Sequence, residues 1–217
     1  MSPPPKHQPS PPKDQRRASE PPFVGLTGGV AAGKSEAMAA FARFGAATLS
    51  SDAVVHELLE DPAVRSRLVE RWGPDVLANG RLDRERIGAV VFERPEELAW
   101  LESTLHPLVA RRIVDWRRSL ASGTSLAVVE VPLLFEAGME PAFDATVAVV
   151  AADEARAGRA TARGTSLLAG RNERQLAQGE KARRATHVIP NDGSLIELEG
   201  EVERVFSLLA ANSREDR

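Results

Sequence analysis

A glycine-rich segment with the spacing Gly-x-x-x-x-Gly-Lys-Ser constrains this chain more than any other feature. It runs from Gly28 to Ser35. In such a loop the backbone N–H groups surround phosphate oxygens, the lysine reaches the β- and γ-phosphates, and the serine hydroxyl can bind Mg²⁺. The predicted nucleotide-binding residues are Gly28, Gly29, Val30, Ala31, Ala32, Gly33, Lys34, Ser35 and the adjoining Glu36.

The sequence around the loop predicts the strand–loop–helix order that such a loop requires. Residues 23–26 are an apolar strand candidate, and residues 34–44 carry apolar side chains at helical spacing before Gly45. The positive end of that helix would point at the phosphates. Only four of the 28 basic residues are lysines, so a chain rich in arginine has a lysine where the motif needs a compact ammonium group.

Strand and helix candidates alternate along most of the chain. The further strand candidates are residues 47–50, 125–131, 145–151 and 187–189. Ser194 can cap a last helix with an apolar stripe formed by Leu195, Leu198, Val202, Val205, Phe206 and Leu209. We therefore predict an α/β fold with a five-stranded parallel sheet between two layers of helices.

Two parts depart from this alternation. Residues 53–122 read as successive helices without a convincing strand; the longest helix starts at Pro95, and Pro107 is expected to bend or restart it. Eight of the first 22 residues are proline, so residues 1–22 are predicted to be a disordered tail. Residues 212–217 are expected to fray.

The composition excludes several classes of protein. A net charge of −3 argues against a chain whose main partner is nucleic acid. The absence of cysteine excludes disulfides and thiolate metal sites, and fits the reducing cytoplasm. No apolar run approaches the length of a membrane span.

Two acidic residues follow predicted strands. Asp52 comes directly after the second strand, at the edge where ligands bind in open α/β sheets, and could accept a proton or help to hold Mg²⁺. It could equally cap the next helix. Glu130 lies near the end of the third strand and is either a carboxylate of the binding pocket or a solvated one.

Other candidates have both a functional and a structural interpretation. The apolar stretch Pro132, Leu133, Leu134 and Phe135 is unusual for a solvated loop and could wall a ligand. His106 is either a packed or surface residue or part of a pocket shaped by Pro107.

Five arginines fall in a glycine-containing segment after the fourth strand. Such a run is either a solvated face or a mobile lid whose arginine neutralises charge during phosphoryl transfer. The arginines are Arg156, Arg159, Arg163, Arg171 and Arg174, and the lid is predicted at residues 158–182. An Asn-Lys-x-Asp motif and a strand ending in aspartate are both absent, which argues against a GTPase switch and a motor ATPase.

Together these features resemble the dephospho-CoA kinase family over residues 22–209. The matching pieces are residues 25–29, Asp52, residues 80–84, 91–92, 105–108 and 131–136, Gln178 with residues 180–182, and residues 188–193. The resemblance implies an ATP-dependent phosphotransferase that moves the γ-phosphoryl group of ATP to the 3′-hydroxyl of dephospho-CoA, the last step of coenzyme A synthesis. It implies ATP and Mg²⁺ as cofactors.

The resemblance also implies roles for individual residues. Asp52 would be the general base, Lys34 and the loop would bind phosphates, Ser35 would bind Mg²⁺, and Arg163 would be the lid arginine. Asn191 would lie near the adenine. The acceptor site would comprise Asp52, His106, Glu130, Pro132, Leu133, Leu134 and Phe135. We expect a P-loop kinase domain over residues 23–211, with residues 53–122 as its CoA-binding insertion, acting as a cytoplasmic monomer whose partners are ATP and dephospho-CoA.

Four positions depart from the family pattern. Glu36 stands where serine or threonine is usual, and Ser50 replaces a frequent second acid, for which Glu130 could compensate. Ala31-Ala32 replaces Gly-Ser, which the loop tolerates if both φ angles stay negative, and His187 replaces aspartate. Two alternatives remain at this point: a kinase for another nucleotide or small metabolite, and a catalytically weakened ATP-binding paralogue.

Overall fold

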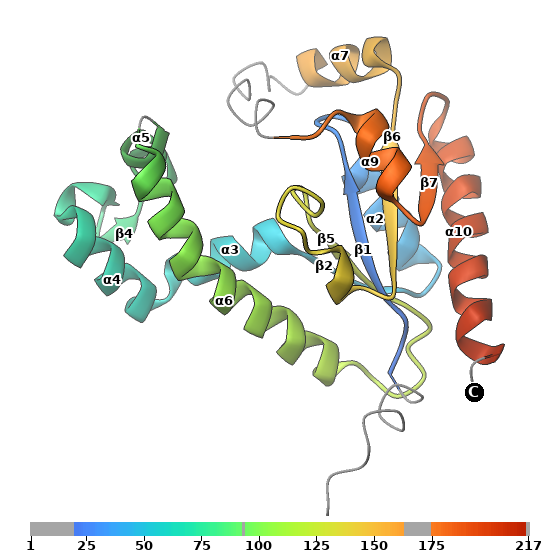
Figure 1. The fold of residues 1–217 in the computed structure, drawn as a ribbon, viewed down its shortest axis with the longest axis horizontal. Coiled ribbons are helices and arrows are strands. Elements are labelled where there is room, and N and C mark those ends of the chain that lie inside the picture. Colours follow the sequence, from blue (N-terminus) through green and yellow to red (C-terminus); the bar gives the residue numbers. More distant parts are fainter. Residues whose placement is uncertain (1–19, 93, 163–174, 216–217) are drawn as a thin grey trace, which may run out of the picture.

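A five-stranded parallel sheet forms the centre of the molecule (Figure 1). The computed structural model describes residues 20–92, 94–162 and 175–215. The strands lie in the order β2-β5-β1-β6-β7, and the paired strands are parallel. They comprise β1 (Phe23–Gly28), β2 (Ala47–Ser50), β5 (Ala127–Glu130), β6 (Ala145–Val150) and β7 (His187–Pro190). The predicted sheet is confirmed, and each strand overlaps its predicted range.

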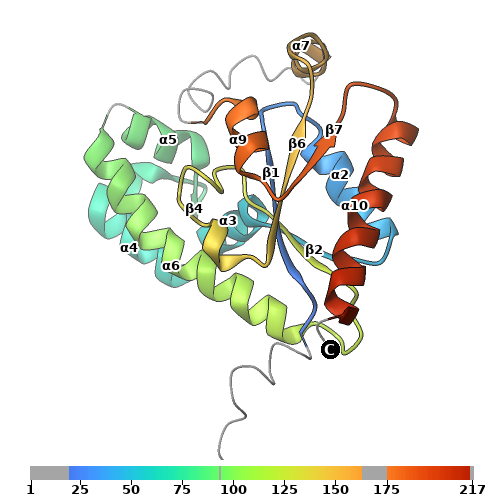
Figure 2. The same ribbon diagram turned by 45° about the vertical axis from the view of Figure 1, so that its right-hand side comes forward.

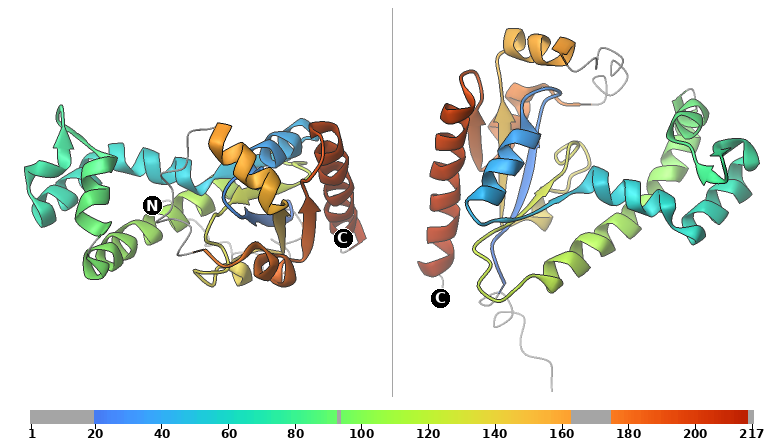
Figure 3. Two further views of the ribbon diagram at one scale, coloured as in Figure 1. Left: turned by 90° about the horizontal axis from the view of Figure 1, so that it is seen from above. Right: turned by 180° about the vertical axis from the view of Figure 1, so that it is seen from behind.

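Helices cover both faces of this sheet because its central strands are apolar on both sides. All of β1 is buried, as is β6 up to its last residue. Helices α2 (Lys34–Arg43) and α10 (Leu195–Glu215) pack together on one face, where Phe41 is fully buried (Figure 3). Helices α3 (Ser51–Glu60) and α6 (Pro95–Ser119) contribute side chains to the core on the other face.

The segment between β2 and β5 extends away from the sheet as a helical arm (Figures 1 and 2). Besides α3 and α6 it contains α4 (Pro62–Trp72), a 3₁₀ turn (Pro74–Val76) and α5 (Arg84–Phe92). Its outer part has a core of its own, in which Leu68 and Val76 are almost fully buried. The expectation of no strand here was wrong, since β3 (Leu77–Ala78) and β4 (Arg81–Leu82) form a short antiparallel hairpin. Two-residue strands have no period that a sequence could reveal.

Two further local predictions need correction, and a third is confirmed. Helix α6 continues through Pro107, because Leu105, Val109 and Ile113 bury its surface on both sides of the proline. Leu195 is 65% exposed and lies outside the apolar stripe of α10. Ser194 does precede that helix, and its hydroxyl accepts a hydrogen bond from Glu197 N at 3.3 Å.

The helices after β6 lie near the carboxyl end of the sheet (Figure 1). Those between β6 and β7 are α7 (Asp153–Ala162) and α9 (Gln178–Arg184); a 3₁₀ turn (Glu140–Ala142) precedes β6. Much of the predicted lid, including Arg163, Arg171 and Arg174, lies outside the described residues, as does the proline-rich tail up to residue 19. Within the described ranges, no helix combines the length and apolar character needed to cross a membrane.

Candidate active site

The candidate functional residues lie at one edge of the sheet, where its parallel strands end. The glycine-rich loop follows β1, Asp52 follows β2, Glu130 ends β5 and Asn191 follows β7. Ser50 of β2 and Leu26 of β1 are both register partners of Glu130, so the second and third strands bring their ends together beside the loop. This is the edge at which open α/β sheets bind ligands.

The glycine-rich loop is folded around its own lysine. Lys34 Nζ donates hydrogen bonds to the carbonyl oxygens of Gly28 and Gly29, at 3.2 and 3.0 Å. Burial lowers the pKa of Lys34; the charges of Glu130 and Asp52 oppose this shift, while those of Lys181 and Arg156 add to it. The ammonium group is thus desolvated between groups of both signs, with two backbone carbonyl oxygens as its acceptors.

Asn191 supports the loop from the end of β7. Its side-chain Nδ2 donates to Ala32 O at 2.8 Å, and both groups are buried. Gly33 has a φ of 99°, and a Cβ built on it would lie 2.0 Å from Asn191 Nδ2. Only glycine fits this position, for both conformational and steric reasons. Asn191, predicted to lie near the adenine, therefore also fixes the loop itself.

Ala31 takes a conformation that the sequence analysis did not expect. Its φ is 57°, in the left-handed region, so the condition that both alanines keep negative φ fails at this residue. A non-glycine residue there carries a strain of about 1–2 kcal/mol. This strain lies within the glycine-rich loop, and strained backbone of this kind clusters at functional sites.

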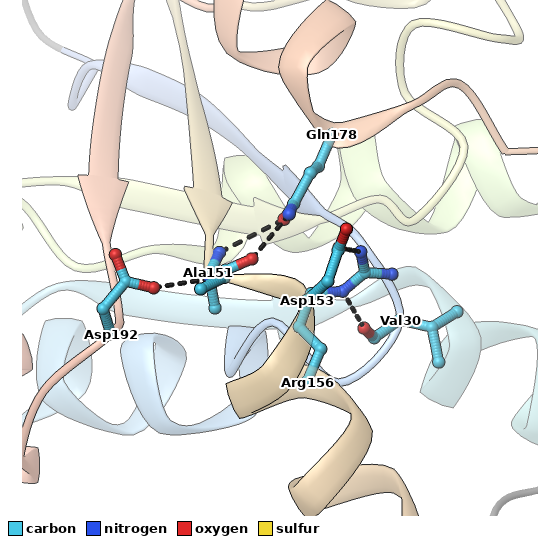
Figure 4. A network of polar contacts seen from close by, with 7 residues as sticks. Val30, Ala151, Asp153, Arg156, Gln178 and Asp192 are labelled. Atoms are coloured by element: carbon cyan, nitrogen blue, oxygen red, sulfur yellow. Dashed lines mark hydrogen bonds and ion pairs between the residues drawn. The ribbon is translucent and has the colours of Figure 1, made fainter.

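Two arginines of α7, Arg156 and Arg159, contact the loop and its support, and Figure 4 shows the first of them. Arg156 Nε donates to Val30 O at 2.9 Å, while its guanidinium pairs with Asp153 at 2.9 Å. Arg159 donates to the backbone oxygen of Asn191 at 3.0 Å. Among the five candidate arginines, these two have described positions at the loop, whereas Arg163, assigned by the resemblance, lies outside the described residues.

Two side chains that the sequence analysis missed hold the backbone just after β6. Gln178 holds Ala151 through both backbone groups, at 3.1 Å from its N and 2.5 Å from its O, and Asp192 accepts from Ala152 N at 2.5 Å (Figure 4). A side chain that bonds to the backbone of a distant strand leaves no periodic signal. Gln178 could have been selected only through its place in the family-like segment.

The acidic residues form the other side of the site. Burial raises the pKa of Glu130, and the neighbouring charge of Asp52 raises it further, while Lys34 and a hydrogen bond from Ser50 oppose the shift. Asp52 is exposed in the first turn of α3. It does not cap that helix, which begins one residue earlier with Ser50 at the N-cap position, so the capping interpretation was wrong. The structure brings Lys34, Asp52 and Glu130 into one electrostatic cluster.

The apolar stretch after β5 is mostly core. Leu134 and Phe135 are buried, and a Cβ added to Gly25 would lie 2.5 Å from Leu134 Cδ1, so β1 has a glycine where Leu134 packs. Pro132 and Leu133 keep partial exposure. Two of its four side chains are therefore partly accessible, and the other two anchor the stretch to the sheet.

The remaining predicted residues lie around this centre. Ser35 is exposed in the first turn of α2, with Glu36 half-buried beside it. His106 is exposed in the middle of α6, on the helical arm. A hollow of about 440 Å³ next to Asn191 is lined by Pro190, Asp192, Gly193 and residues of the first turns of α10.

Comparison with known proteins identifies the family. The family model for dephospho-CoA kinase matches residues 22–197. The chain belongs to the dephospho-CoA kinase family. A dephospho-CoA kinase of Chlorobaculum tepidum is 38% identical over 202 residues, covering 89% of this chain and 97% of that protein. One from Deinococcus radiodurans is 39% identical over 206 residues, covering 93% of this chain and 96% of that protein.

Solved structures share the fold of this chain. The crystal structure of TT1252 from Thermus thermophilus matches with a TM-score of 0.75 and 33% identity, covering 87% of this chain and 98% of that one. A dephospho-CoA kinase from Campylobacter jejuni has the same fold, with a TM-score of 0.59 and 24% identity over 86% of this chain and 96% of that one. The P-loop kinase fold predicted from the sequence is confirmed.

Proposed function

We propose that this protein transfers the γ-phosphoryl group of ATP to the 3′-hydroxyl of dephospho-CoA, forming CoA and ADP. One observation carries the proposal: the phosphate-binding Lys34 shares an electrostatic cluster with the carboxylates of Asp52 and Glu130. A donor site and a proton acceptor thus meet at one edge of the sheet, in a chain of the dephospho-CoA kinase family.

Asp52 is the residue that we assign as general base. Its carboxylate is exposed, so a substrate hydroxyl can reach it. The same carboxylate lies close enough to Lys34 for its charge to raise the pKa of that lysine. It orients the ribose 3′-hydroxyl and takes its proton as the oxygen attacks the γ-phosphorus and the bond to the β-phosphate oxygen breaks. Lys34 stabilises the negative charge that develops on the phosphoryl oxygens.

The oxygen groups at this edge fit Mg²⁺. Among the described residues, no cluster of three or more His, Cys, Asp or Glu side chains could hold a metal by itself. The Ser35 hydroxyl, exposed beside the loop, would be the direct protein ligand, and the carboxylates of Asp52 and Glu130 would hold its water molecules. When bound, the ion would supply neutralisation of phosphate charge.

Binding of the two substrates is assigned to opposite sides of this centre. The adenine of ATP would occupy the hollow beside Asn191, bordered by the end of β7 and the start of α10. Dephospho-CoA would have Pro132 and Leu133 on one side and the helical arm that carries His106 on the other. Arg163 stays the arginine that the family resemblance assigns to the transferred phosphoryl group, and Arg156 is a second candidate from the described residues.

The function is tested by incubating the protein with ATP, Mg²⁺ and dephospho-CoA and measuring CoA by mass spectrometry. CoA formation with one ADP per CoA supports the proposal. Tight ATP binding without transfer would instead identify a binding protein, and transfer only to another acceptor would identify a different kinase.

The base assignment is tested by Asp52→Asn. We expect turnover to fall by roughly 10²–10⁴-fold, while the dissociation constant of ATP changes little. Asp61→Asn is the matched control, because Asp61 caps α4 on the helical arm and asparagine caps equally well. Parental turnover in Asp52→Asn would show that another group accepts the proton.

A further inference from the structure

The described part of the chain contains two lysines, and both lie at the candidate site. Lys6 and Lys13 belong to the N-terminal tail, which leaves Lys34 and Lys181. Lys181, in α9, has a relative exposure of 0%. A fully buried ammonium group has a large desolvation cost and is found where its partners are fixed.

Lys181 ties α9 to the segment that follows β5. Its Nζ donates to Pro132 O at 2.7 Å and pairs with Glu136 Oε1 at 2.9 Å. The same Pro132 oxygen accepts a hydrogen bond from Thr27 Oγ1 at 3.1 Å. Because Thr27 precedes the glycine-rich loop, one carbonyl oxygen joins β1, the segment after β5 and α9.

Two more contacts attach this segment to the chain around α9. Glu136 Oε1, besides pairing with Lys181, accepts a hydrogen bond from Leu176 N at 2.8 Å. The guanidinium of Arg184, one turn after Lys181, lies 4.9 Å from the centre of the Phe135 ring. Residues 131–136 are called the acceptor segment below. Contacts from α9 and from Leu176, just before it, thus hold this segment near its start and at its end.

The position of Lys181 also connects it to the phosphate side of the site. Burial lowers the pKa of Lys34, and the charge of Lys181 is among the neighbours that lower it further. A buried ion pair usually contributes little net stability compared with apolar residues of similar shape, so geometry is the better explanation for a lysine here.

We propose that Lys181 is a positioning residue that fixes the acceptor segment against β1, so that the bound acceptor meets Asp52 and the γ-phosphoryl group in register. The inference rests on the proposed function for its kinetic consequence. Its structural part, the immobilisation of residues 131–136, is independent of any substrate.

The test variant is Lys181→Met, which keeps the length of the side chain and removes its charge and donors. The matched control is Arg43→Met, which removes a cation paired with Glu199 at 2.6 Å between α2 and α10 on the opposite face. Thr27→Val provides a second, uncharged way to remove a donor to Pro132 O, and keeps the proposal testable if Lys181→Met does not fold.

The first readout is hydrogen–deuterium exchange without substrates. We expect amides of residues 131–139, which include Val131 N bonded to Leu26 O and Met139 N bonded to Leu134 O, to exchange at least tenfold faster in Lys181→Met. Exchange in β6, the internal reference strand, should stay within about twofold, and Thr27→Val should show a smaller change in the same direction. Unchanged exchange in the acceptor segment would overturn the proposal.

The second readout separates positioning from general destabilisation. We expect the KM for dephospho-CoA to rise at least tenfold in Lys181→Met, with the dissociation constant of a fluorescent ATP analogue within threefold of the parent. Equal losses for both substrates, accompanied by faster exchange throughout the sheet, would indicate a purely structural lysine. A parent protein that makes no CoA would refute the proposed function, and the exchange data alone would then decide the role of Lys181.

Discussion

Gly33 and Asn191 offer a direct test of how the glycine-rich loop is held. In Gly33→Ala, the new methyl group would lie 2.0 Å from Asn191 Nδ2, so the amide must leave Ala32 O. In Asn191→Ala, the same hydrogen bond is lost without a collision. The two substitutions remove one interaction by two routes, so their effects on stability should not add.

The structure sets the size of each effect. Asn191→Ala leaves the fully buried Ala32 oxygen without its partner, which costs about 1–3 kcal/mol. Gly33→Ala incurs that cost and, at a φ of 99°, a conformational cost of about 1–2 kcal/mol. The double variant has no amide to collide with, so it should lose only about as much stability as Gly33→Ala alone. The coupling energy is therefore about 1–3 kcal/mol.

The assay is urea unfolding of the parent, the two single variants and the double variant. It should be followed by far-ultraviolet circular dichroism, since the three tryptophans (Trp72, Trp100 and Trp116) all lie in the helical arm. The double variant is expected to unfold at nearly the same urea concentration as Gly33→Ala. Additive losses would refute the argument, because they would show that Gly33 and Asn191 stabilise the loop independently.

Three further predictions concern single residues of the site. Ala31→Gly should be about 1 kcal/mol more stable than Ala32→Gly in urea unfolding, because only Ala31 has left-handed strain to relieve; equal values would contradict this. Burial raises the pKa of Glu130, so ionisation of this carboxyl group above its raised pKa destabilises the fold. Glu130→Gln should therefore raise the Tm by more at pH 7.5 than at pH 4.5. An increase in Tm of the same size at both pH values would contradict this prediction. Arg156→Gln should weaken ATP binding about tenfold in calorimetric titration, because Arg156 places a cation on the loop. Arg204→Gln, at an exposed ion pair on α10, is the control and should leave the affinity for ATP unchanged. Equal ATP affinities of the two variants would show that Arg156 is not part of the site.

The sequence predicted the sheet and the phosphate side of the site for clear physical reasons. Strands buried on both faces are continuous apolar runs, as in β6, and the glycine-rich loop depends on residue types at fixed spacing. Asp52 and Glu130 could be found because Glu130 ends a strand and Asp52 follows one closely, and the carboxyl ends of parallel strands lie at one edge.

Other features could not be predicted because they depend on distant contacts. The left-handed Ala31 and the Asn191 amide bonded to Ala32 O become visible only when β7 lies beside the loop. Leu134 and Phe135 were expected to wall a ligand, yet the packing of Leu134 against Gly25 buries it. Lys181 was noted only as part of a family-like segment, since burial of a lysine depends on partners 45 and 49 positions away.

The measurement that tests the central claim most directly is a competition between acceptors. Equimolar dephospho-CoA, adenosine and AMP are offered to the protein with ATP and Mg²⁺, and the phosphorylated products are separated and identified by mass spectrometry, with ³¹P NMR to locate the new phosphate. The account predicts CoA, phosphorylated at the ribose 3′-oxygen, as the dominant product. Faster phosphorylation of adenosine or AMP, or release of phosphate without CoA, would contradict it.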